Sequence, residues 1–234
     1  LEETLQPNKD FEPEHSHRVF RIMASDYAAS TLIPALLKRL RAEAPTTSLD
    51  IMTPSDVTFH DVENGKVDMA INRFEQLPQS FHQKTIWRDS FACLVHKQNP
   101  IHNHFNLDSY LKAQHIWVSK TGFGVGVGMD PADVQKLGWV DEALAKFGKQ
   151  RNISVFTRNY HVAMHLAVET DLIATLPLRA AQLYKNDPTM EILDPPFPIP
   201  SIELKMIWSP LLHQDASHIW LRRMIVEIAD ELTH

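Results

Sequence analysis

The chain has 234 residues, of which 44% are hydrophobic and 22% are charged, and this composition excludes a wholly disordered protein. Its 23 basic and 29 acidic side chains give a formal net charge of -6 and form no dense basic run, so the chain alone is a poor candidate for contacting a DNA backbone. No apolar stretch is long enough to span a bilayer and no signal-peptide pattern is present. We therefore expect a cytoplasmic protein without a membrane partner.

The first segment, residues 1–17, is polar and contains Pro7 and Pro13, a composition typical of a linker. The sequence begins at Leu1 rather than at methionine. We therefore expect this segment to follow an upstream part that has been removed.

From Arg18 onwards, short apolar strands alternate with amphipathic helices, which predicts parallel α/β packing rather than separate all-β and all-α domains. We expect strands at residues 19–23, 49–52, 67–71, 86–95, 116–118, 153–157, 172–176 and 202–208. We expect helices at residues 32–40, 55–64, 134–147 (broken or entered at Gly138), 160–169, 179–184 and 218–232. The proline-rich segment 194–200 must be extended, and we expect it to cross between two lobes.

Motifs for catalysis and for cofactor or metal binding are absent. The glycines of segment 122–128 alternate strictly, which matches neither G-x-G-x-x-G nor a phosphate loop. His161 and His165 stand four apart but lack the glutamate of a zinc protease, and no G-x-S-x-G elbow is present. The single cysteine, Cys93, lies in an apolar run and is interpreted as an inert core thiol in a reducing compartment. We expect no enzyme, no cofactor and no metal site.

Four segments, in their order and spacing, resemble the LysR-type family of bacterial transcriptional regulators. They are residues 20–27, 32–37, 62–71 and 167–177, and the resemblance covers roughly residues 18–232. Residues 170–177, together with 220–222, are similar to one branch of the family in particular. That branch holds regulators of aromatic degradation that respond to salicylate-like acids, and the nodulation regulators. The sequence departs from the family pattern at Thr170 and Asp171, where many members have small residues.

The resemblance implies an α/β fold of two Rossmann-like lobes joined by two crossover strands, like a type 2 periplasmic binding protein. Residues 1–17 would then link to a missing N-terminal winged-helix DNA-binding domain. Lobe I would take residues 18–91 and 199–234, and lobe II residues 92–198. A small-molecule effector, expected to be aromatic or carboxylated in this branch, would bind in the interlobe cleft. The partners implied are a homodimer or homotetramer, promoter DNA through the missing domain only, and RNA polymerase.

Candidate ligand contacts follow from the rule that open α/β sheets bind ligands at the carboxyl ends of strands, beside helix N-termini. The residues that follow four predicted strands are polar or aromatic. They are Ser25, Asp26, Tyr27, Ser55, Thr121, Phe123, Asn159 and Tyr160. Helix capping alone is the alternative for Ser25, Asp26, Ser55 and Asn159, because their side chains suit N-caps.

Two other classes of protein share the two-lobed architecture. A solute-binding protein of a transport system is disfavoured by the absent signal peptide and by the polar N-terminal linker. A two-lobed transferase, such as a deaminase of the porphyrin pathway, would need a cofactor-bearing cysteine in a cleft loop. Cys93 lies in an apolar strand instead and suits that role badly.

Overall fold

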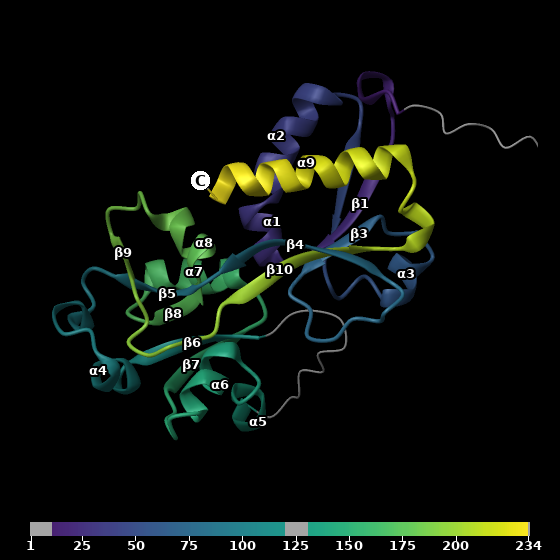
Figure 1. The fold of residues 1–234 in the computed structure, drawn as a ribbon. Coiled ribbons are helices and arrows are strands. Elements are labelled where there is room, and N and C mark those ends of the chain that lie inside the picture. Colours follow the sequence, from purple (N-terminus) through teal and green to yellow (C-terminus); the bar gives the residue numbers. More distant parts are fainter. Residues whose placement is uncertain (1–10, 120–130, 234) are drawn as a thin grey trace, which may run out of the picture. The chain divides into compact units, whose positions relative to one another are not determined.

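The structure, a computed structural model, describes residues 11–119 and 131–233 (Figure 1). The chain divides into two compact units. Unit 1 contains Leu1–Trp87 and Leu204–His234, and unit 2 contains Arg88–Glu203. Helices and strands alternate along the chain, so the mixed α/β fold predicted from the sequence is confirmed.

The sheet of unit 1 has five strands in the order β2-β1-β3-β10-β4. The strands are β1 (Val19–Ala24), β2 (Ser48–Met52), β3 (Met69–Asn72), β4 (His82–Asp89) and β10 (Ile202–Trp208). The helices are η1 (Pro13–His15), α1 (Asp26–Thr31), α2 (Ile33–Glu43), α3 (Phe59–Glu63), η4 (Pro210–Leu212) and α9 (Ala216–Thr233). β1 is parallel to β2 and β3, whereas β10 is antiparallel to β3. β4 and β10 also carry the chain from one unit into the other.

The sheet of unit 2 has five strands in the order β7-β6-β8-β5-β9. The strands are β5 (Phe91–His96), β6 (Gln114–Val118), β7 (Asn152–Thr157), β8 (Ile173–Pro177) and β9 (Met190–Leu193). The helices are η2 (Pro100–Asn103), α4 (Leu107–Lys112), α5 (Pro131–Gln135), α6 (Trp139–Ala145), α7 (Tyr160–Glu169), α8 (Leu178–Ala181) and η3 (Gln182–Tyr184). β6 is parallel to β7 and β8, and β5 is antiparallel to β8 and β9.

The expected helix cap at Ser55 is wrong. α3 begins four residues later, at Phe59, because Thr58 and Asp61 form a capping box in which each side chain bonds the backbone N–H of the other. Ser55 instead lies in the turn after β2, where its hydroxyl bonds that of Thr53 at 2.8 Å.

The predicted helix 134–147 is two helices, and Gly138 is the N-cap of the second. A Cβ at Gly138 would lie 2.5 Å from Nε1 of Trp117 and 3.1 Å from Oδ2 of Asp141. Only glycine therefore allows this close approach. The same indole N–H donates to the carbonyl of Gln135 at 3.1 Å, where the first helix ends. The predicted strand 86–95 is likewise two strands, separated at Ser90.

The long helix α9 is held on unit 1 by both apolar and charged contacts. Leu221, Ile225 and Ile228 are buried on its inner face. Figure 1 shows α9 running beside α2, and Arg39 of α2 reaches Glu227 of α9 at 2.5 Å. The amphipathic pattern that predicted this helix thus marks the face that packs on the unit.

The first turn of α9 is fixed by a buried histidine. The Nε2–H of His218 donates to the carbonyl of Asp68 at 2.8 Å, and its Nδ1 accepts from Arg222 at 2.5 Å. The carboxylate of Asp68 in turn accepts from Arg18 at 2.5 Å and from the backbone N–H of Arg21 at 2.8 Å. Burial lowers the pKa of His218 to about 4, and the cationic Arg222 adds to the effect. His218 is therefore neutral near neutral pH.

We predict that His218 makes unit 1 less stable in mild acid. Its folded-state pKa of about 4 lies below the ordinary value of 6.5, so between these pH values the unfolded chain binds more protons. The free energy of unfolding should therefore fall as the pH drops from 7.5 to 5, with His218 contributing on the order of 1–2 kcal/mol of the loss. Urea denaturation across this range measures the slope.

His218→Gln should flatten that slope, because glutamine keeps a donor for the carbonyl of Asp68 but does not titrate. The matched control is His60→Gln, since the His60 side chain is 77% exposed on α3. Part of the slope should remain in His218→Gln, because burial also lowers the pKa of His115 in unit 2 to about 3. An equal slope in His218→Gln and wild type would contradict the prediction.

Candidate functional site

The polar residues after β1 lie at the edge of the unit 1 sheet where the parallel strands end. Ser25 is 3% exposed, and its hydroxyl accepts from the N–H of Ala28 at 3.2 Å, capping α1. Its own N–H donates to the carbonyl of Ile71, at the end of β3. Ser25 therefore has the capping role that the sequence offered as one interpretation, and this position is also compatible with ligand contact.

Asp26, Tyr27 and Ser55 lie at the same edge of the sheet. Asp26 and Tyr27 open α1, and the Tyr27 hydroxyl accepts from Nε1 of Trp87 at 3.0 Å. Ser55 follows β2, which is paired with β1, and is exposed. Because β1 and β2 are parallel, the residues after them meet at one edge. The structure thus brings these candidates together within unit 1.

In unit 2, Asn159 and Tyr160 lie at the start of α7, as predicted. The Oδ1 of Asn159 accepts from the N–H of Val162 at 3.0 Å, which makes Asn159 the N-cap. Tyr160 is buried as the first helical residue. The other two candidates of this unit, Thr121 and Phe123, lie outside the residues that the structure describes.

Ser119 is a candidate that the sequence reasoning missed. It follows β6 directly, and its N–H donates to the carbonyl of Thr157 at 3.0 Å, at the end of β7. The residue is 1% exposed, yet its hydroxyl has no hydrogen-bond partner among residues 11–119 and 131–233. A buried hydroxyl without a partner costs about 1–3 kcal/mol, so such a group calls for an explanation. A serine directly after a buried strand was the available signal, the same one that identified Ser25.

Two aromatic rings and a cation lie beside Ser119 at the carboxyl ends of β6 and β7. Trp117 and Phe156 are paired across the two strands, with ring centroids 5.5 Å apart. The guanidinium of Arg158 lies 5.5 Å from the centroid of the Trp117 ring. The sequence reasoning did not select Trp117 or Arg158, because their proximity depends on the pairing of strands about 40 residues apart.

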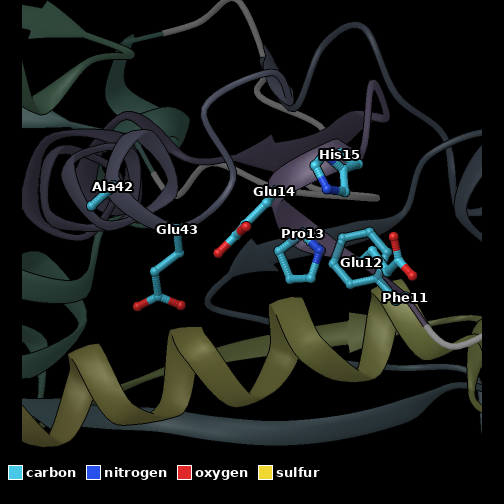
Figure 2. Close-up of a pocket in the computed structure, with 7 residues that line it drawn as sticks. All are labelled: Phe11, Glu12, Pro13, Glu14, His15, Ala42 and Glu43. Carbon is cyan, nitrogen blue, oxygen red and sulfur yellow. The ribbon is translucent and has the colours of Figure 1, made fainter.

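A separate hollow of about 730 Å³ lies on unit 1 between η1 and the end of α2 (Figure 2). Its lining residues are Phe11, Glu12, Pro13, Glu14, His15, Ala42 and Glu43. η1 precedes β1, so this hollow lies at the opposite end of the strand from Ser25. Three carboxylates line it, and Glu43 is already paired with Arg39 at 2.8 Å. Neither its position nor its charge fits a site for an anionic ligand.

The described part of the chain offers no cluster of three or more histidine, cysteine or acidic side chains that could hold a metal ion. Within that same part, no helix combines the length and the apolar character needed to cross a membrane. The strand ends described above are candidate ligand positions in each unit taken by itself, and the chemistry available there is hydrogen bonding, ring contact and, in unit 2, positive charge.

Ser119 and Ser25 allow a test of the site in the ligand-free protein. We predict that Ser119→Ala leaves the free energy of unfolding unchanged or raises it by up to about 1–3 kcal/mol, because it removes an unpartnered buried hydroxyl. Ser25→Ala should lower it by about 1 kcal/mol, because it removes a helix cap. Both serines are buried after a strand, so each is the control for the other. Equal destabilisation in urea titrations would contradict the prediction.

The family and the fold emerge from comparison with known proteins. The family model described as "LysR substrate binding domain" matches residues 13–230. The HTH-type transcriptional activator NahR of Pseudomonas putida is 26% identical over 230 residues, covering 97% of this chain and 73% of NahR. Nodulation protein D 1 of Bradyrhizobium sp. (strain NC92) is 26% identical over 222 residues, covering 94% of this chain and 67% of that protein.

Among solved structures, the chain is similar to the regulatory domain of MexT, a transcriptional activator in Pseudomonas aeruginosa. The TM-score is 0.73 at 30% identity, covering 91% of this chain and 98% of that domain. The two five-stranded sheets match the type 2 periplasmic-binding-like fold of LysR regulatory domains, which confirms the predicted fold class. The chain belongs to the LysR substrate binding domain family, the effector-binding part of LysR-type transcriptional regulators.

Proposed function

We propose that the chain binds a small aromatic or carboxylated effector and thereby controls a DNA-binding transcriptional regulator. The observation that carries the proposal is the buried hydroxyl of Ser119, which lacks a partner in the described residues and lies at the end of a strand. The family to which the chain belongs consists of transcriptional regulators, and this membership favours neither an enzyme nor a solute-binding protein of a transport system.

The start of α7 supports the effector class. Asn159 uses its Oδ1 to cap the helix, and its amide NH₂ has no partner in the described part of the chain. A helix N-terminus carries a partial positive charge, and the first turn of α7 contains no acidic residue. These groups suit an acceptor such as a carboxylate. The aromatic part of the proposal rests on the similarity to the aromatic-degradation branch.

The remaining parts of the proposal concern the whole regulator. We place the linker at residues 1–17, after an N-terminal winged-helix domain that contacts promoter DNA in the cytoplasm, with RNA polymerase as a further partner. Effector binding would shift the equilibrium between conformations of the regulator. The free energy of this shift cannot exceed the difference between the effector's binding free energies for the two conformations.

We predict that Asn159→Ala and Ser25→Ala each weaken the binding of an aromatic acid. The panel is benzoate, salicylate and 4-hydroxybenzoate, titrated calorimetrically. Loss of one hydrogen bond to a charged group should lower the affinity about ten- to a hundred-fold. The matched control is Asn152→Ala, at the other end of β7, where the Asn152 amide donates to the carbonyl of Leu111. Undiminished binding in both folded variants would contradict the assignment of these residues.

We also predict that the chain self-associates, as a homodimer or homotetramer. α2 buries Ile33, Leu36 and Leu40 but leaves Leu37 45% exposed. Sedimentation at tens of micromolar should show a dimer or larger species, and Leu37→Glu should shift it towards monomer. Leu183→Glu is the control, because Leu183 is a similarly exposed leucine in η3. A wild-type chain that sediments only as monomer would contradict the prediction.

A further inference from the structure

Four side chains form two cross-strand pairs on one face of the unit 2 sheet. Trp117 of β6 lies opposite Phe156 of β7. The hydrogen bond from the N–H of Ser119 to the carbonyl of Thr157 continues this parallel ladder, so Ser119 lies opposite Arg158. Residues two apart in an extended strand share a face. An aromatic pair is therefore followed, at the carboxyl end of the strands, by a hydroxyl and a cation.

Arg158 is held in place by a ring rather than by an acid. Its guanidinium lies 5.5 Å from the centroid of the Trp117 ring, within the range of a cation–π interaction. No carboxylate pairs with it in the described part of the chain. By contrast, Arg88 and Arg151 of the same unit are paired with Glu203 and Asp141. The positive charge of Arg158 is thus oriented but not neutralised by the residues described.

A carboxylate fits the polar pair. It accepts hydrogen bonds only, and a guanidinium and a hydroxyl both donate. Ser119 supplies a buried hydroxyl without a partner, and Arg158 supplies the charge. We propose that Arg158 is the residue that selects for a negatively charged effector, so that the ligand class is an aromatic carboxylate rather than a neutral aromatic molecule. This inference rests on the function proposed above and names the substrate class of the same site.

The test compares acids with their neutral amides, which have nearly the same shape. The chain is titrated by calorimetry with benzoate, salicylate and 4-hydroxybenzoate, and separately with the matching amides benzamide, salicylamide and 4-hydroxybenzamide. The wild-type chain should prefer the acid. Arg158→Gln should weaken acid binding about ten- to a hundred-fold and leave amide binding unchanged, which removes the preference.

Two further variants separate the geometry of Arg158 from its charge. Arg158→Lys keeps the charge but loses the planar fork, so it should retain part of the preference. Lys149→Gln is the matched control, because it removes one exposed positive charge before the amino end of β7. It should keep the wild-type preference in full.

The outcomes distinguish this inference from the proposed function. If Arg158→Gln binds a ligand and keeps the preference for acid, or if the wild-type chain binds amides as tightly as acids, the inference is overturned and the effector-binding function stands. If neither acids nor amides bind to the wild-type chain, both proposals for the effector are overturned. Loss of the preference in Arg158→Gln alone, with Lys149→Gln unchanged, supports the inference.

Discussion

The ion pair between Asp141 and Arg151 is the interaction on which the carboxyl end of β6 depends. Both side chains are buried, and the guanidinium contacts both carboxylate oxygens, at 3.0 and 2.8 Å. The amide of Gln135 bonds Asp141 and the backbone carbonyl of Arg151, and the carbonyl of Gln135 accepts the indole N–H of Trp117. Breaking a buried pair by removing one partner typically costs about 3–5 kcal/mol. Removal of the Asp141 carboxylate would thus disturb the position of the Trp117 ring, over which the Arg158 guanidinium lies.

The sequence predicted those elements whose signals are local. α7 and β10 have the bounds that were expected, because apolar periodicity marks them. α9 begins two residues earlier and ends one residue later than expected. Gly138 marked a break or a start within residues 134–147, and it is the N-cap of the second helix, but its close approach to Trp117 depends on folding and no local pattern reports it. α4 was missed although Asn106 and Ser109 form a capping box. β9 was missed because it has only four residues and lies at the sheet edge.

The candidate site was predictable to the level of strand ends but not to the level of partners. The rule that ligands bind at the carboxyl ends of parallel strands selected Ser25 and Asn159, and both are helix caps in the structure. It could not separate a serine whose hydroxyl is satisfied from one whose hydroxyl is not, because that difference depends on neighbours brought in by folding. Ser119 is such a case, and functional sites are where local consistency is expected to fail.

The single cysteine gives the chain an internal probe of its own opening. Cys93 lies in β5, an interior strand of the unit 2 sheet between β8 and β9, and its Sγ lies 3.4 Å from the Thr175 hydroxyl. Burial raises the pKa of its thiol to about 12, so thiol reagents will react slowly with the folded chain near neutral pH. The rate at which a thiol reagent labels Cys93 therefore reports how often unit 2 opens, and the labelled residue is known in advance because the chain has one cysteine. The same inertness means that a fluorophore or spin label can be attached at a new surface cysteine without first replacing the native one.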